Sequence, residues 1–463
     1  MSSVLHHPGY RRLFTAQVIA LVGTGLATVA LSLLAYDIAG ADAGSVLGTA
    51  LTIKMVAYVA LAPLISALAH RLPPRPLLVG TDLVRALAAL ALPFVTAVWQ
   101  VYVLILVLQA ASATFTPAFQ SLIPHLLPTE DAYTRALSLS RLAYDLEVIV
   151  SPVLAAALLT HFRYDWLFLG TVAGFLGSAW LVLTTALPRV PAPTSAPAPG
   201  AASAADPPDL LARATRGTRI FLATPRLRAL LALTLSIAAG GAVVMVHTIV
   251  YVRDHLGRAS SDVPVALGAY GAGSILAALL IPRLLRRTGE QSVMLPAAFA
   301  SAGLLLALAA LASAGPRGGW AWPALLTLWW ALGAAESVIM TPTGRLVRRS
   351  ASPADLNAAF AAQFSLAHGC WLLTYPLAGW LGTAAGLAAA AWVLGAVALG
   401  AALAAKRLWP APDPAQLPYV HTTLTRNHPH LTDAEHVGTG WRHSHDFVID
   451  DLHDRWPLHP RRS

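Results

Sequence analysis

The feature that most constrains this chain is a series of apolar stretches, each long enough to cross a lipid bilayer. A transmembrane helix needs about 20 apolar residues. Of the 463 residues 56% are hydrophobic and 11% are charged, whereas a soluble domain carries about 25% charged residues. This composition excludes a soluble globule and predicts an all-α membrane protein with two six-helix halves. The predicted spans are residues 13–36, 45–69, 77–98, 100–122, 136–160, 165–187, 229–252, 263–285, 291–313, 320–342, 357–381 and 384–405.

The distribution of arginine predicts the orientation of these spans. Arginines cluster at both termini and in the loops that follow the even-numbered spans, and the opposite loops hold only Arg163, Arg253, Arg258 and Arg317. Cytoplasmic loops of membrane proteins are enriched in Lys and Arg. We therefore predict a multi-pass protein of a bacterial-type inner (plasma) membrane with both termini in the cytoplasm. The net charge of +9 follows from this bias, so we predict the lipid bilayer and a small substrate as partners, a monomer, and no nucleic-acid partner.

The order of apolar and polar segments predicts four parts. Residues 1–187 form an N-terminal six-helix half, and residues 188–228 form a cytoplasmic linker. The linker begins with a Pro/Ala-rich segment that is too polar to span a membrane, and it ends with a basic segment expected to lie at the membrane interface. Residues 229–408 form a C-terminal six-helix half, and residues 409–463 form a cytoplasmic His-rich tail.

The loop between the second and third predicted spans reads SALAHRLPPRP. It is similar to the loop motif Gly-x-x-x-Asp-Arg-x-Gly-Arg-Arg of the major facilitator superfamily, a family of transporters with two six-helix halves. Arg71 and Arg75 stand at two arginines of the motif, and His70 replaces its aspartate. The resemblance implies a gating loop, in which Asp82 and Arg85 of the next span are candidates to supply the missing charge pairing.

A second segment, in the fifth span, favours export. Ser151-Pro152 with Ala155-Ala156 resembles the Gly-Pro-x-x-Gly-Gly segment of the exporter subgroup of this superfamily. The whole chain resembles the drug and metal efflux branch. The start YRRLFTAQ, the segment ALSLSRLAYDLE and the ending RHSHDFVIDDLHDRWP resemble nickel-resistance exporters with a His-rich C-terminal tail.

Four further charged residues interrupt the second and fifth predicted spans. Lys54 lies in the second span, and Arg141, Asp145 and Glu147 lie in the fifth. A charge at membrane depth costs about 2.5–3.5 kcal/mol on insertion scales, so such residues face a cavity and pair with one another. Arg141 and Asp145 share a helical face, and Lys54 is a candidate partner for Glu147 or Asp145. These residues form either a fixed ion-pair cluster or a network that carries the coupling proton.

The C-terminal half offers candidate metal ligands. His247 lies in the seventh span, Glu336 and Met340 share a face of the tenth, and His368 lies near the middle of the eleventh. Imidazole and carboxylate together suit late first-row divalent ions, so these residues are the predicted substrate or metal site in the cavity. The alternative is structural, because histidines in membrane helices often hydrogen-bond to a neighbouring helix and methionines fill space.

The polar tail is rich in histidine and lacks cysteine. Neutral imidazole is the commonest side-chain ligand for metals. A flexible segment would bring neighbouring histidines, such as His443 and His445, onto one metal ion. The alternatives are that the tail is merely soluble or that FVIDDLHDRW docks on the helices. The predicted metal-binding residues of the tail are His421, His428, His430, His436, His443, His445 and His453.

The leading interpretation is a proton-coupled secondary exporter of a divalent metal, Ni²⁺ first and Co²⁺ second, that confers metal resistance. The alternative is a proton-driven exporter of an organic compound such as a macrolide-like drug or a siderophore. A third reading, from another class, is a membrane-embedded metal sensor or scaffold. The sequence has no Walker loop, nucleophile elbow or HExxH motif, so we predict neither an enzyme nor a bound cofactor. The metal and the proton would be cargo and coupling ion.

Overall fold

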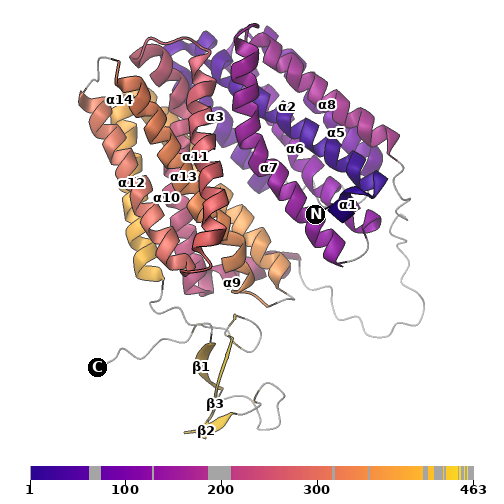
Figure 1. Cartoon of the computed structure of the whole chain (residues 1–463), viewed down its shortest axis with the longest axis vertical. Coiled ribbons are helices and arrows are strands. Elements are labelled where there is room, and N and C mark those ends of the chain that lie inside the picture. The colour runs from indigo at the N-terminus through magenta and orange to yellow at the C-terminus, as the bar shows by residue number, and fades with distance from the viewer. Residues whose placement is uncertain are drawn as a thin grey trace.

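The computed structural model is a bundle of long helices with a small sheet below it (Figure 1). It describes residues 2–61, 74–127, 130–185, 210–314, 319–352 and 355–409. In the tail it describes residues 416–421, 431, 434–438, 440–446, 448–449, 453 and 456. Arg71, His428 and His430 lie outside these ranges, and the side chains of Arg141, Asp145, His443 and His445 lie outside the described part.

The N-terminal half contains the helices before residue 186. They are α1 (Ser2–Leu5), α2 (Pro8–Ala39), α3 (Ala43–Val56), α5 (Pro74–Ala91), α6 (Val98–Leu126), α7 (Glu130–Leu159) and α8 (Asp165–Thr184). Short tight turns η1 (Gly40–Asp42) and η3 (Leu92–Phe94) join neighbouring helices, and the π-helical segment η2 (Ala57–Leu61) continues α3.

The C-terminal half follows the linker helix α9 (Leu210–Ala223). Its helices are α10 (Pro225–Val250), which continues into the π-helical segment η4 (Tyr251–His255), α11 (Asp262–Leu284), α12 (Glu290–Ala314), α13 (Ala321–Arg348) and α14 (Leu356–Leu408). α10 begins at Pro225, four residues before the predicted start of this half at 229, because Pro225 occupies the first turn, where its missing N–H costs nothing.

The prediction of an all-α membrane fold is confirmed. In the described part of the chain, nine helical stretches are long and apolar enough to cross a membrane. Two of them, residues 8–59 and 358–408, each run through two consecutive predicted spans. Within α14 the helix is broken at Gly386, whose φ of 85° favours glycine. Large apolar side chains on the outside, such as Phe94 and Leu279, are 79% and 64% exposed, as expected where lipid replaces water.

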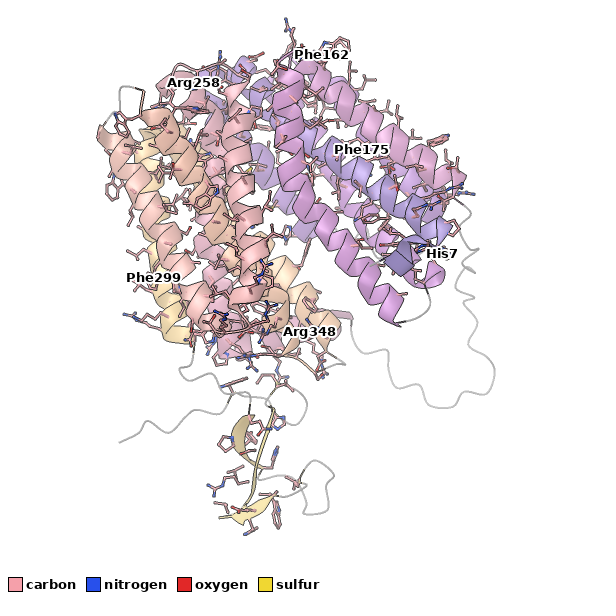
Figure 2. All side chains as sticks on the ribbon, viewed as in Figure 1. His7, Phe162, Phe175, Arg258, Phe299 and Arg348 are labelled. Atoms are coloured by element: carbon pink, nitrogen blue, oxygen red, sulfur yellow. The ribbon has the colours of Figure 1, made fainter. Side chains whose placement is uncertain are left out.

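The two halves are joined at one end of the bundle, which we call the outer end. There the Tyr36 hydroxyl of α2 donates a hydrogen bond to the Asp254 carboxylate of η4. α3 crosses α14 so closely that a Cβ on Gly48 would lie 2.8 Å from the Cα of Gly379. α7 also contacts α11, and Figure 1 shows these two ribbons close at the outer end and diverging toward α9. Figure 2 places Phe162 and Arg258 at the outer end and Arg348 at the opposite, inner end.

Helix α9 lies at the inner end and is fixed to the C-terminal half. Arg216 forms an ion pair with Asp355, the residue that precedes α14. At Gly217 a Cβ would lie 2.0 Å from the carbonyl oxygen of Ala358, so only glycine permits this approach. Ile220 and Phe221 are buried against the same half. The basic segment expected at the membrane interface is therefore a helix docked on the inner end.

The tail differs from the flexible segment that the sequence predicts. It contains a three-stranded antiparallel sheet in the order β1 (Gln416–His421), β3 (Gly440–Asp446), β2 (Glu435–Val437). Ile449 and Trp456 pack against buried residues of the C-terminal half. The ring of Trp456 lies 5.0 Å from the guanidinium carbon of Arg226 in α10. The contacts of Ile449 and Trp456 agree with the alternative expectation that this segment docks on the helices.

Candidate functional site

The structure places Lys54 and Glu147 where they interact across the interior of the N-terminal half. Lys54 is in the last turn of α3, Glu147 is in the middle of α7, and their opposite charges attract one another. Lys54 and Glu147 form no direct ion pair with the described residues, so their attraction acts over a longer distance. The pair is a candidate coupling site because it holds one carboxylate and one ammonium at membrane depth.

The neighbourhood of Glu147 is shaped by Gly25 of α2. A Cβ on Gly25 would lie 3.3 Å from Oε1 of Glu147 and 2.0 Å from Oγ of Ser151. Glu147 and Ser151 are four residues apart, so they share the face of α7 that meets α2. Ser151 is 1% exposed, and its hydroxyl has no hydrogen-bond partner among the described residues. Because Gly25 has no side chain, α7 packs closely against α2 at this point.

An aromatic cluster joins the two halves beside Lys54. The His368 ring of α14 lies 5.5 Å from the Tyr58 ring of η2 and 4.0 Å from the Phe364 ring. Nδ1 of His368 donates to the Phe364 carbonyl oxygen at 2.7 Å, which leaves Nε2 as the free acceptor. The charge of Lys54 opposes a positive charge on His368. A cation bound at this imidazole would meet the same repulsion.

His247 occupies a different place, at the outer end. Its Nε2 hydrogen-bonds to the Ala378 carbonyl oxygen at 2.9 Å. A Cβ on Gly382 would lie 2.0 Å from Cε1 of His247, and one on Gly44 would lie 3.6 Å from the same atom. The imidazole therefore fills the space beside two glycines, one from each half. This is a structural role at a helix crossing.

The predicted metal set is not gathered into one site. Glu336 of α13 interacts electrostatically with Tyr375 of α14, and Met340 packs against the inner apolar cluster that includes Ile339. His368 and His247 have the separate surroundings described above. No group of three or more His, Cys, Asp or Glu side chains suited to a metal ion occurs among the described residues.

The described residues assigned to the predicted gating loop make contacts inside the N-terminal half. Arg75 donates to the carbonyl oxygens of Leu183 and Thr185 at the end of α8. Asp82 and Arg85 form an ion pair with each other within α5. The Arg85 guanidinium lies 4.3 Å from the Phe115 ring centroid and 4.5 Å from that of Phe175, which Figure 2 labels. Asp82 and Arg85 thus hold α5 against α6 and α8 inside the N-terminal half.

Three tail histidines are described, and two of them form part of a packed aromatic group. The His421 and His453 rings lie 5.0 Å apart, and Tyr419 contacts both. His421 and His453 are 3% and 1% exposed. His436 packs edge-on against Trp441 at 4.9 Å. In this arrangement the imidazoles contribute to the folding of the tail.

The sequence interpretation missed the polar contacts that join the halves at the outer end. Tyr36 and Asp254 are at helix ends next to loops, and the Arg253 guanidinium lies 5.5 Å from the Tyr36 ring. Nothing in the spacing of these residues marks them as partners, because they are 218 residues apart. It also missed the small and polar face of α2, for which a signal exists: Thr24 and Thr28 are four residues apart, a spacing typical of close helix contacts.

Comparison with known proteins finds distant relatives that are named efflux or drug-resistance proteins. The chain is 25% identical over 184 residues to macrolide efflux protein A of Streptococcus pyogenes, which is 39% of this chain and 44% of that protein. It is 27% identical over 169 residues to multidrug resistance protein MdtG of Enterobacter lignolyticus, which is 36% of this chain and 40% of that protein. The chain thus matches less than half the length of these relatives.

Solved structures agree with the fold. The nucleoside transporter NupG has a TM-score of 0.65 at 15% identity, with 86% of this chain and 100% of that chain covered. A bacterial homologue of the lysosomal transporter Spinster, in an inward-facing and occupied conformation, has a TM-score of 0.65 at 12% identity, with 88% and 98% covered. The family model described as Major Facilitator Superfamily matches residues 13–322 and 250–429. This multi-pass membrane protein therefore belongs to the major facilitator superfamily, a family of transporters and not of enzymes.

Proposed function

We propose that this transporter exports an organic compound from the cytoplasm and is driven by protons. The observation that carries the proposal is the Lys54–Glu147 pair at membrane depth next to the aromatic cluster of Tyr58, Phe364 and His368. Aromatic faces suit an organic body, and a buried carboxylate suits a proton that is taken up and released in each cycle. The relatives are a macrolide efflux protein and a multidrug resistance protein, which supports the same direction of transport.

Export of Ni²⁺ or Co²⁺, the leading interpretation from the sequence, has less support. The candidate ligands His247, Glu336 and His368 have separate surroundings, and Lys54 would repel a divalent cation at His368. In the tail, His421 and His453 pack against Tyr419. We therefore place the organic substrate first.

Uptake measurements in intact cells test the proposal. A drug-sensitive bacterium expressing the protein should accumulate less radiolabelled erythromycin than cells without it, and a protonophore should abolish the difference. Glu147→Gln should behave like the empty cell, because an amide cannot take up the coupling proton. Glu435→Gln, whose side chain is 79% exposed in the tail, is the matched control and should export normally.

Cell nickel is measured in the same experiment. Unchanged erythromycin together with lowered nickel would reverse our choice between the two substrates. Unchanged levels of both, with the protein shown to be in the membrane, would refute both assignments.

A further inference from the structure

Helix α11 has one buried face and one exposed apolar face. The buried face packs against α13 so closely that a Cβ on Gly273 would lie 1.8 Å from the Trp330 carbonyl oxygen. The exposed face carries four leucines that are between 44% and 64% exposed: Leu276, Leu279, Leu280 and Leu284. Because α11 is long and apolar enough to cross a membrane, an exposed leucine stripe at this helical spacing contacts the acyl chains of lipids.

The leucine stripe ends in three arginines at the inner end of the bundle, to which α11 descends in Figure 1. Arg283 lies in the last turn of α11, three residues after Leu280. Arg286 and Arg287 follow in the next turn, and all three side chains are exposed. Long basic side chains at the end of a membrane helix reach into the headgroup layer of the bilayer. The surface of α11 therefore changes from acyl-chain to headgroup chemistry within about one turn.

These three positive charges are not balanced by the protein around them. The side chains of Arg283, Arg286 and Arg287 make no ion pair or hydrogen bond with the described residues. The nearest carboxylate along the chain, that of Glu290, is only 5% exposed and already pairs with two arginines at the end of α13. An anion from outside the protein is thus the partner that fits.

The leucine stripe and the arginines together restrict the chemistry of this anion. A guanidinium binds a phosphate group through two parallel hydrogen bonds. Inorganic phosphate would satisfy the arginines but not the leucines, and phosphatidylcholine carries its own balancing ammonium. A phospholipid with net negative charge satisfies both parts of the surface.

We propose that the inner end of α11 binds an anionic phospholipid. The phosphate lies at Arg283, Arg286 and Arg287, and an acyl chain lies along the leucine stripe. This site is separate from the cavity between the halves, so the proposal does not depend on the identity of the transported substrate.

Lipid binding to the purified full-length protein in detergent, counted by native mass spectrometry, tests the proposal. The probes are dioleoylphosphatidylglycerol and dioleoylphosphatidylcholine, which share their acyl chains and differ in net charge. The variants are Arg283→Gln, Arg286→Gln and Arg287→Gln, made singly and together. Arg442→Gln is the matched control, because it removes the same charge from an exposed side chain in β3 of the tail.

Phosphatidylglycerol should bind the wild type about 10-fold more tightly than phosphatidylcholine, and each single α11 substitution should weaken its binding by about five-fold, the contribution of one basic residue beside an anionic membrane surface. Arg442→Gln should bind phosphatidylglycerol like the wild type. Without added lipid, the triple variant should melt at the temperature of the wild type, because the three arginines hold no partner within the protein.

Four results would overturn the proposal. Equal binding of the two lipids would remove the preference for negative charge, and unchanged phosphatidylglycerol binding by the triple variant would place the lipid elsewhere. Displacement of the lipid by inorganic phosphate would indicate a site for a soluble anion. A lower melting temperature of the triple variant without lipid would show that the arginines stabilise the protein itself.

Discussion

At the scale of single residues, the contact between Gly25 and Ser151 predicts that a larger side chain at residue 25 lowers the stability of the protein. Gly25→Ala places a Cβ 2.0 Å from Oγ and 2.2 Å from Cβ of Ser151, so α2 and α7 must separate. Overpacking of this kind costs about 1–3 kcal/mol, and the melting temperature in detergent should fall. Adding Ser151→Gly removes the opposing side chain and should restore most of the loss. A double variant as unstable as Gly25→Ala would contradict this account of the contact.

Asp355 predicts a pH dependence for the docking of α9. Burial raises the pKa of Asp355, but hydrogen bonds from Arg216 and Ser352 and the Arg216 charge outweigh this and lower it. The folded-state pKa is thus below the unfolded value of about 3.9, so the ion pair stabilises the fold at neutral pH and loses this effect as pH falls through the folded pKa. Asp355→Asn should cost about 1 kcal/mol at pH 7, after allowance for the half-exposed Arg216.

Thermal unfolding of the wild type and Asp355→Asn at several pH values measures this effect. The two melting temperatures should differ at pH 7 and converge as the pH falls through the lowered pKa of Asp355. A difference that is the same at every pH would show that the lost stability does not depend on the charge of Asp355.

At the scale of elements, the crossing of α3 and α14 predicts how one methyl group alters the transport cycle. Gly48→Ala places a Cβ 2.8 Å from both the Gly379 Cα and the Tyr375 carbonyl oxygen, which are backbone atoms that cannot rotate away. The outer end should therefore open. Spin labels at Phe162 and Trp320, in a Cys370→Ser background, should show a longer distance. Gly80→Ala, with nothing within 4 Å of its Cβ, should leave the distance unchanged.

The sequence predicts the elements unevenly, for physical reasons. The long helices follow from apolar length alone, and the break near residue 384 appears at Gly386. The intramembrane charges Lys54 and Glu147 are also visible in the sequence, since they are costly in lipid. Helical spacing shows which residues share a face of one helix, but it does not show which helices meet. It therefore groups His247, His368 and Glu336, which the structure places in separate surroundings. The strands of the tail escape detection because they are short and polar.

At the scale of the whole molecule, the Tyr36–Asp254 contact predicts that its loss shifts molecules from a closed to an open outer end. Asp254 receives a hydrogen bond from Tyr36 across the two halves, whereas Asp262 pairs with Arg258 at 2.9 Å within the C-terminal half. Asp254→Ala should weaken closure by about 1 kcal/mol, roughly a five-fold change in the ratio of closed to open molecules. The same spin-label pair should report more open molecules for Asp254→Ala than for Asp262→Ala. Equal populations would show that the Tyr36–Asp254 contact does not hold the outer end shut.

The docking of α9 has a consequence for how the chain could be divided. Its ion pair to Asp355, its close approach at Gly217 and the tail's contact at Arg226 all belong to the C-terminal half. A gene cut just before Leu210 would thus yield two polypeptides, the second of which keeps its own inner-end contacts. Co-expressed, the two pieces should reassemble through the Gly48–Gly379 crossing, so this transporter is suited to complementation between separately made, and separately mutated, halves.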